Sequence, residues 1–241
     1  MAEYDLSLFK AGLNELNITL TDEQIQQFLK YYDLLVEWNK VMNLTGITEF
    51  EEVIQKHFLD SLCLVKAVEI TKNLTLLDLG TGAGFPGIPL KIAFPELEIV
   101  LLDSLNKRIR FLNEVIASLD LKGITAIHGR AEELARKKDY REQFDLCVSR
   151  AVANLSSLSE YCIPFVKKNG IFVSYKSADA DEEITAAKHA VFLLGGKISH
   201  VEKYQIPESD MGRSLVCIKK EKNTGRAYPR KPGTPAKIPL K

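Results

Sequence analysis

The stretch that most constrains the fold runs from Leu74 to Leu90 and reads LTLLDLGTGAGFPGIPL. A short apolar run ends at Asp78, glycines follow at positions 80, 82 and 84, and an apolar segment resumes after Pro86. This order predicts a buried strand, a glycine-rich turn and the first turn of a helix. Alternate glycines keep side chains off the backbone, and their amides lie near the positive end of a helix. Such a loop can hold a nucleotide-like ligand.

Two classes of nucleotide are compatible with this loop. The G-x-G-x-x-G fingerprint of NAD(P)-dependent oxidoreductases is formally satisfied by Gly82, Gly84 and Gly87. Against it, Pro86 lies inside the fingerprint, and a carboxylate at Asp78 would repel a pyrophosphate. The pattern acid-x-Gly-x-Gly-x-Gly that begins at Asp78 resembles the first motif of S-adenosylmethionine-dependent methyltransferases. The cationic sulfonium of that ligand tolerates a carboxylate at the strand end.

Four separated motifs resemble one family within this superfamily. They are LLDLGTGAGFPGIPLKI, WNKVMNLTGIT (Trp38 to Thr48), KHFLDSL (Lys56 to Leu62) and SRAVANL (Ser149 to Leu155). Together they resemble the RsmG family, also called GidB, from about Leu13 to the C-terminus. The resemblance implies S-adenosylmethionine as cofactor, guanine N7 in 16S ribosomal RNA as the methylated atom, and 16S RNA or the small ribosomal subunit as partner. A non-catalytic RNA-binding ribosome-assembly factor is a further alternative, although a pure binder has no need of the intact glycine loop.

Composition sets the outer bounds. The 241 residues carry 32 basic and 32 acidic side chains, and no N-terminal basic-then-apolar signal is present. No apolar run approaches the roughly 20 residues that span a bilayer. The four cysteines are widely spaced, without a C-x-x-C pair, which predicts reduced structural thiols. We therefore expect a cytoplasmic protein without membrane contact, and a monomer without a metal site.

The chain divides into three predicted parts. Residues 1–70 are predicted to form an N-terminal helical cap, with helices at Leu6–Leu16, after the capping box of Thr21 and Gln24, and at Glu49–Val68. Residues 71–220 form the predicted α/β methyltransferase domain, and residues 221–241 a basic, proline-rich tail.

Strands and helices alternate from Leu74 onward, which indicates a mostly parallel, doubly wound sheet. The predicted strands are Leu74–Leu79, Glu98–Asp103, Ile124–Gly129, Phe144–Ser149, Ile171–Tyr175, Ile198–Gln205 and Leu215–Lys219. The predicted helices are Pro86–Ala93, Leu105–Leu119, Ala131–Lys138, Leu155–Tyr161 and Asp179–Leu193. The last two strands are too close in sequence for a helical crossover, so they should pair antiparallel. The resemblance likewise implies a seven-stranded, Rossmann-like class I methyltransferase fold.

The tail carries six basic residues and no acid between Lys222 and Lys241. This charge favours contact with a polyanion such as RNA. Four prolines are expected to exclude regular structure. Because the predicted ligand site lies entirely upstream, deletion of the tail should leave cofactor affinity nearly untouched.

Strand ends identify the candidate cofactor residues, because ligands of open α/β sheets bind at the carboxyl ends of strands. Asp78 and Gly80 end the first strand, Gly82 follows in the glycine loop, and Asp103 ends the second strand. A carboxylate at Asp103 can accept hydrogen bonds from both ribose hydroxyls; the alternative role is to cap the next helix.

Carried over from the family's motifs, cofactor contacts fall on Gly80, Phe85, Ala131, Glu132 and Arg150. Arg150 is also the one candidate for positioning the reacting groups. No other catalytic residue is expected, because guanine N7 has a lone pair and needs no general base; alignment and desolvation would suffice.

Two rival chemistries lack their signatures. Carbon-5 methylation of pyrimidines needs a cysteine nucleophile, typically after proline, and no such cysteine occurs. Amino methylation usually has an Asn/Asp-Pro-Pro-aromatic loop after the fourth strand, where this chain has Ser-Arg-Ala-Val. The pair His57 and Asp60 is open between a structural hydrogen-bonding pair and a metal or acid–base role. Candidates for phosphate contacts are Lys91, Arg108, Arg110, Arg150, Lys176 and Arg213.

Overall fold

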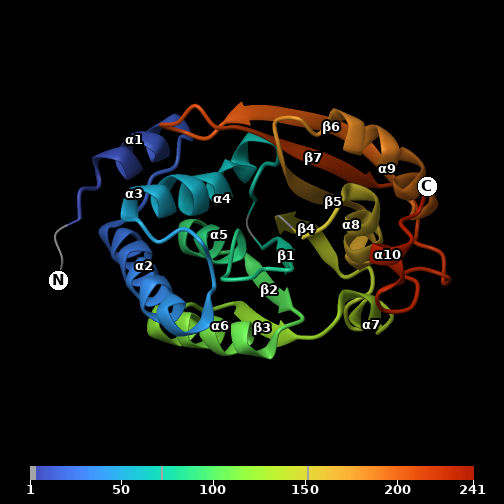
Figure 1. The fold of residues 1–241 in the computed structure, drawn as a ribbon, viewed down its shortest axis with the longest axis horizontal. Helices are drawn as coiled ribbons and strands as arrows, with labels where there is room; N and C mark the ends of the chain where they lie inside the picture. Colours follow the sequence, from blue (N-terminus) through green and yellow to red (C-terminus); the bar gives the residue numbers. More distant parts are fainter. Residues whose placement is uncertain (1–3, 72, 151) are drawn as a thin grey trace.

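A single seven-stranded sheet organises the computed structural model, which describes residues 4–71, 73–150 and 152–241. Residue 151, within the SRAVANL motif, and the first three residues of the predicted cap lie outside these ranges. The strand order is β3-β2-β1-β4-β5-β7-β6 (Figure 1). The strands are β1 Thr75–Leu79, β2 Glu98–Asp103, β3 Ile124–His128, β4 Phe144–Arg150, β5 Val166–Ser177, β6 Gly196–Gln205 and β7 Gly212–Lys220.

The first five strands are parallel, and β7 is antiparallel to both β5 and β6. The predicted antiparallel pairing of the last two strands is confirmed. Since β7 lies between β5 and β6, the short connection after β6 returns the chain into the sheet. All parallel strands therefore end at the same edge, where a ligand of an α/β sheet binds.

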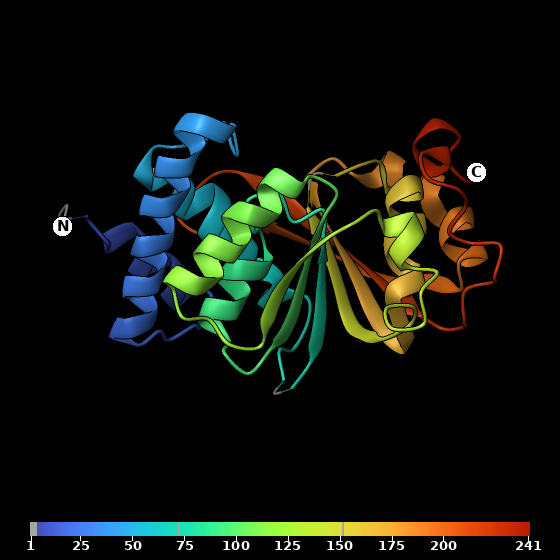
Figure 2. The ribbon, with the colours of Figure 1, turned by 90° about the horizontal axis from the view of Figure 1, so that it is seen from below.

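Both faces of the sheet are buried, as the continuous apolar strands predict. Successive residues of β1 point to opposite sides, so Leu76 belongs to one hydrophobic cluster and Leu77 to the other. The first cluster includes the helices before β3, and the second includes the helices after it (Figures 1 and 2). The helices of the first side are α1 Ser7–Glu15, α2 Asp22–Met42, α3 Phe50–Val53, α4 Asp60–Leu62, α5 Gly87–Ala93 and α6 Asn106–Ser118. Those of the second are α7 Ala131–Leu134, α8 Leu155–Cys162, α9 Asp181–Leu193 and α10 Thr234–Lys237.

The cap begins its long helix α2 with the predicted capping box, in which Thr21 and Gln24 exchange hydrogen bonds. The Gln24 amide also donates to the carbonyl of Ile92 at 2.7 Å, so the box fastens α2 to α5. The predicted helix Glu49–Val68 is a continuous series of turns with changing pitch. It passes through α3, a π-helix at Ile54–Leu59, α4 and a 3-10 helix at Cys63–Lys66.

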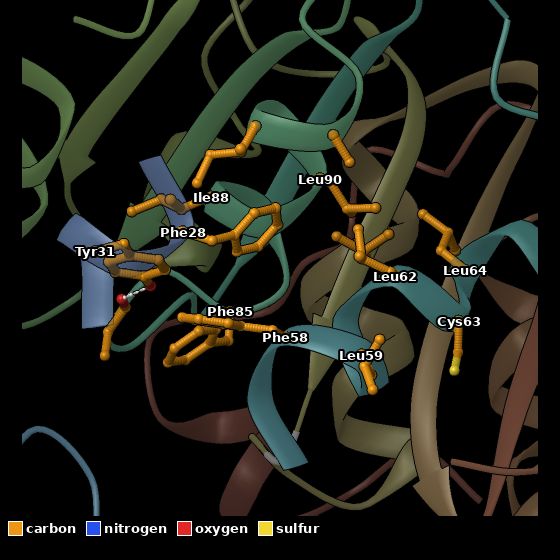
Figure 3. Close-up of a cluster of buried hydrophobic side chains, with 14 of the residues drawn as sticks. Phe28, Tyr31, Phe58, Leu59, Leu62, Cys63, Leu64, Phe85, Ile88 and Leu90 are labelled. Atoms are coloured by element: carbon orange, nitrogen blue, oxygen red, sulfur yellow. Dashed lines mark hydrogen bonds between the residues drawn. The ribbon is translucent and has the colours of Figure 1, made fainter. Parts of the chain in front are cut away.

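Cap and sheet share one apolar core. Figure 3 shows Phe58 and Tyr31 from the cap beside Phe85 and Ile88 from the glycine loop and α5. The Tyr31 hydroxyl donates to the carbonyl of Ala83 in that loop. Phe58, Tyr31, Phe85 and Ile88 are all nearly or fully buried. The cap therefore fixes the conformation of the loop by direct packing.

Two boundaries differ from expectation by four residues or more. The helix predicted to run to Lys138 ends at Leu134, because residues 136–139 are all charged and offer no apolar side chain to pack. Strand β5 begins at Val166, five residues before the predicted start, and Val166 pairs with Phe144. The four cysteines are buried free thiols, and no helix among the described ranges has the length and hydropathy of a membrane span.

The tail is packed on the second face of the sheet, where its end lies beside α8 and α9 (Figures 1 and 2). Arg230 pairs with the fully buried carboxylate of Glu160. Tyr228 and Leu240 pack against the apolar cluster of that face. The expectation that prolines exclude regular structure is wrong for residues 234–237, where α10 accommodates Pro235 in its first turn, which needs no proline N–H.

Candidate active site

Two adjoining cavities lie at the carboxyl ends of the parallel strands. The cap-side cavity, of about 590 Å³, is lined by the glycine loop, the cap and the ends of β4 and β5. The tail-side cavity, of about 470 Å³, is lined by the ends of β1 and β2, the start of α7 and the tail. Gly80 and Arg108 line both. One elongated ligand could therefore occupy the two cavities across Gly80.

The glycine loop needs glycine for its backbone. Gly80 and Gly82 have φ angles of +71° and +63°, a region that strains other residues. A Cβ at Gly80 would collide with the side chain of Val152, whereas a Cβ at Gly82 would have only a carbonyl oxygen at 3.9 Å near it. The backbone at Gly82 is thus open to the cap-side cavity, which a ligand can approach closely.

Asp78 supports the loop from inside. Its Oδ2 accepts hydrogen bonds from the Thr81 hydroxyl at 2.6 Å and from the Gly87 amide at 2.8 Å. Asp78 is fully buried and lines neither cavity, and burial raises its pKa to about 6. The predicted cofactor residue is placed where it holds the loop and the first amide of α5 rather than at the cavity surface.

Asp103 makes contacts on both sides of the turn that follows β2. Its Oδ1 accepts a hydrogen bond at 2.9 Å from the amide of Leu105, the N-cap residue of α6, so the carboxylate lies beside the helix start without capping its first turn. Its Oδ2 accepts from the Gly82 amide at 3.0 Å and from Arg108 at 3.1 Å, and the residue lines the tail-side cavity. One carboxylate thereby joins the ends of β1 and β2 and faces the ligand space.

Ala131 and Glu132, for which the family motifs implied cofactor contacts, begin α7 and line the tail-side cavity. The Glu132 Oε1 accepts a hydrogen bond from the Gly233 amide at 2.8 Å. Gly233 and Ala236 themselves line the cavity. The prediction that the ligand site lies entirely upstream of the tail is therefore wrong, because two tail residues form part of its wall.

Arg150 enters the cap-side cavity from the end of β4. Its guanidinium donates to Asp60 Oδ2 at 2.7 Å and to the Lys56 carbonyl at 3.1 Å, and its centre lies 5.2 Å from the centroid of the Phe85 ring. Asp60 also accepts from the Tyr204 hydroxyl at 3.0 Å. Residues from three distant segments therefore fix the position of this cation.

His57 is stacked on Phe85, with ring centroids 4.4 Å apart and ring planes at 20°. Its Nε2 lies 2.9 Å from the hydroxyl of Thr45. Burial, with the charge of Arg150 next, lowers the His57 pKa to about 3, so the imidazole is neutral near pH 7. His57 and Asp60 both contact Arg150, whose guanidinium lies 3.4 Å from His57 Nδ1 and 2.7 Å from Asp60 Oδ2. The described residues contain no cluster of His, Cys, Asp or Glu suited to a metal.

The cap-side cavity is rich in cations. Lys56, Lys176 and Arg213 line it in addition to Arg108 and Arg150. Of the other phosphate candidates, Lys91 is buried, with its ammonium bound to the carbonyls of Pro95 and Leu97, so that prediction is wrong. Arg110 is exposed on α6 and lines neither cavity.

Sequence reasoning missed the cap loop between α2 and α3. Leu44, Thr45 and Ile47 line the cap-side cavity. The loop is held by Asn39, whose side chain accepts hydrogen bonds from the amides of Leu44 and Thr45. The motif WNKVMNLTGIT contains all four residues, and the break in its helical pattern after Met42 was the available signal.

Solved structures resemble the fold at low sequence identity. TrmN from Thermus thermophilus superposes with a TM-score of 0.53 at 13% identity, over 69% of this chain and 53% of that one. M. jannaschii TYW2 in complex with AdoMet superposes with a TM-score of 0.54 at 15% identity, over 72% and 77%. Together with the strand order, these similarities confirm the predicted Rossmann-like class I methyltransferase fold.

Sequence relatives are much closer. Ribosomal RNA small subunit methyltransferase G of Lachnoclostridium phytofermentans is 59% identical over 98% of each chain. The protein of the same name from Desulforamulus reducens is 52% identical over 98% of this chain and 99% of its own. Residues 24–212 match the GidB family, described as rRNA small subunit methyltransferase G. The chain therefore belongs to the GidB family of ribosomal RNA methyltransferases, as its four motifs predicted.

Proposed function

We propose that this protein transfers the methyl group of S-adenosylmethionine to N7 of a guanine in 16S ribosomal RNA. The observation that carries the proposal is the pair of cavities joined at Gly80, in a chain of the GidB family. The tail-side cavity has two carboxylates, Asp103 and Glu132, beside two arginines, and the cap-side cavity has five cations beside the carboxylate of Asp60. The two carboxylates of the first suit hydroxyl and amino groups of a nucleoside, and the excess of cations in the second suits a polyanionic substrate.

The residues present fit this cofactor. Asp103 and Glu132 would bind the adenosine end, and the open backbone at Gly82 leaves room for the amino-acid end. When bound, S-adenosylmethionine supplies a methyl group activated by its sulfonium. The chain's own contribution is to hold the two ligands in line and to exclude water, for which Phe85, Ile47 and Leu44 provide apolar wall.

Proton transfer has no part in methylation of a ring nitrogen that already carries a lone pair. The cap-side cavity agrees with this chemistry, because His57 stays neutral and its Nε2 is engaged with Thr45. The Asp60 carboxylate is engaged by Arg150 and Tyr204. The target base must leave its stack to enter, and the surrounding cations can hold the neighbouring phosphates.

The oxidoreductase alternative is disfavoured by one contact. A dinucleotide fold binds pyrophosphate at the helix amides that follow the glycine loop. Here the Gly87 amide, the first of α5, already donates to the buried carboxylate of Asp78. A pyrophosphate there would meet both an occupied donor and a nearby negative charge.

Calorimetry tests the cofactor directly. We expect S-adenosylhomocysteine to bind and NADH to give no heat of binding; the reverse would support the oxidoreductase. Mapping N7 methylation in small-subunit RNA from cells with and without the protein then tests the reaction. Binding of S-adenosylhomocysteine without loss of the methyl group in the deletion strain would contradict the proposed substrate. Binding of RNA without any binding of the cofactor would instead support the assembly factor.

A further inference from the structure

Arg230 anchors the tail at its middle. The backbone amide of Arg230 donates to Glu160 Oε1 at 2.6 Å, and its guanidinium contacts both carboxylate oxygens, at 2.6 to 3.0 Å. The Glu160 side chain is fully buried in α8. Arg230 also donates to the Ile238 carbonyl at 2.8 Å, which folds the segment between these residues into a closed loop. The loop is thus held by a buried ion pair with several charge-assisted hydrogen bonds.

The same loop reaches the tail-side cavity. The Ser157 hydroxyl donates to the Pro235 carbonyl at 2.7 Å, which brings Gly233 and Ala236 to the cavity wall. Gly233, at φ +81°, presents its amide to Glu132 Oε1 at 2.8 Å. A residue of the tail therefore touches a residue predicted to bind the cofactor.

Glu132 has little else to orient it. Its residue exposure is 6%, and among the described residues the Gly233 amide is the one hydrogen-bond partner of its carboxylate. One oxygen is bound by the tail, and the carboxylate faces the cavity with the other available to a donor group on a ligand. A buried carboxylate without this fixed partner would gain rotamers and lack a compensating hydrogen bond.

We propose that the tail segment 230–236 places Gly233 and Ala236 in the wall of the cofactor's nucleoside pocket, and that Arg230 is a positioning residue that acts on Glu132 through Gly233. This inference rests on the proposed function for the identity of the ligand. The segment lies outside residues 24–212, which match the family, so the pocket is completed by a part of the chain beyond that match.

Calorimetric titration of the full-length protein with S-adenosylhomocysteine provides the first test. Arg230→Ala should lower affinity by about tenfold, the equivalent of roughly one charge-assisted hydrogen bond. Arg230→Lys should lie between Arg230→Ala and the unaltered protein, because an ammonium cannot form the forked contact with Glu160. Arg226→Ala is the matched control, since Arg226 is an exposed tail cation of equal charge, and its affinity should stay within about twofold.

A double-mutant cycle separates positioning from general support. If Arg230 acts through Glu132, then Arg230→Ala combined with Glu132→Gln should bind no more weakly than the weaker single variant, to within about twofold. If the losses of affinity in the two single variants multiply in the double variant, the positioning role is overturned and Arg230 is only a structural anchor of the tail. Urea unfolding of each variant, with one cooperative transition, shows that the measured protein is folded.

A second pair of variants avoids disturbing the buried ion pair. Ala236 is exposed and lines the cavity, so Ala236→Trp should narrow the pocket and weaken S-adenosylhomocysteine binding by at least about tenfold. Lys237→Trp adds the same side chain one position away, outside the lining, and should bind normally. If Ala236→Trp, Arg230→Ala and the unaltered protein bind S-adenosylhomocysteine equally well, the inference about the tail is overturned and the proposed cofactor stands. Failure of the unaltered protein to bind would overturn the proposed cofactor, and the inference with it.

Discussion

The two cavities differ in charge and in the part of the chain that supports them. The tail-side cavity has two carboxylates, Asp103 and Glu132, balanced by Arg108 and Arg130, and is lined in part by the tail. The cap-side cavity has Lys56, Lys176 and Arg213 among its cations and is closed by the cap loop. Among the described residues, only Gly80 and Arg108 line both cavities.

This difference separates two recognition problems that must be solved at one sheet edge. Carboxylates suit the hydroxyl and amino donors of a nucleoside, and cations suit phosphates. The strands contribute mainly backbone and a few strand-end residues to the cavities. Most of the discrimination between nucleoside and phosphate groups would therefore come from segments outside the sheet. If the separation is functional, variants on one side should affect one ligand and spare the other.

The largest effect is expected at Arg150, in the cap-side cavity. Arg150→Ala leaves Asp60, a residue with 3% exposure, without the cation that binds it at 2.7 Å, so the free energy of unfolding should fall by about 3 kcal/mol. Methyl transfer should fall with it, since the guanidinium also lies against Phe85. Urea denaturation and a methyl-transfer assay measure the two quantities.

Arg213→Ala is the control for Arg150, because Arg213 lies 4.0 Å from the same carboxylate but is a third exposed. It should cost less than about 1 kcal/mol. Equal losses in the free energy of unfolding for the two variants would show that the buried ion pair with Arg150 stabilises the protein no more than the exposed one with Arg213.

The next effect is expected at Asp103, on the tail side. Asp103→Ala removes charge-assisted hydrogen bonds worth about 1.5–3 kcal/mol, so affinity for S-adenosylhomocysteine should fall at least about tenfold. RNA affinity without cofactor should be unchanged, which sharpens the division between the cavities. Unchanged cofactor affinity in a cooperatively melting variant would limit Asp103 to its hydrogen bonds with the amides of Gly82 and Leu105.

A smaller effect depends on pH. Burial lowers the His57 pKa from 6.5 to about 3, so below pH 6.5 the unfolded chain binds a proton that the folded protein does not. The stability of the folded state is therefore full above pH 6.5 and is lost as pH falls toward 3. At pH 5.5 the stability should be lower by about 1.4 kcal/mol.

His57→Gln should remove the part of the pH dependence of stability that comes from His57, as measured by urea unfolding at pH 7 and 5.5. The raised pKa of Asp78 acts in the opposite direction between about pH 4 and 6, but it is present in both proteins and cancels in the difference. Equal pH dependence in the two proteins would mean that His57 is protonated freely in the folded state.

The smallest effect is expected at the exposed lysines of the tail. Replacing Lys231 and Lys237 by alanine should reduce the slope of log affinity for RNA against log salt by about 0.7–0.9 for each phosphate that the variant no longer binds. Affinity for S-adenosylhomocysteine should stay unchanged, in contrast to Arg230→Ala. An unaltered salt slope would remove the tail from the RNA-binding surface and leave it only its role in the pocket wall.

Local patterns predicted much of the fold. Strand β1, the glycine loop and α5 could be placed because apolar runs and glycines act within a few residues, and the capping box of Thr21 and Gln24 is equally local. The strand-end rule then identified Asp103 and the segment at Glu132, since parallel strands end at one edge.

The missed parts depend on distant partners. The composition of the tail predicts that it cannot order itself alone; it is ordered by Glu160 and Glu132, which lie 70 and 101 residues away from the tail residues that they bind. Asp78 was expected at the ligand because it ends a strand. Its orientation toward Gly87 is set by how α5 packs under the loop, which no spacing in the sequence reveals.

The hydrogen bond between Gly233 and Glu132 also has a consequence for how the protein folds. Closing a loop of 101 residues has a large entropic cost, which falls only after the intervening strands and helices have formed. The tail should therefore dock late in refolding and open early in native-state hydrogen exchange. Competence to bind the cofactor would then appear as a final kinetic step, after the sheet itself is complete.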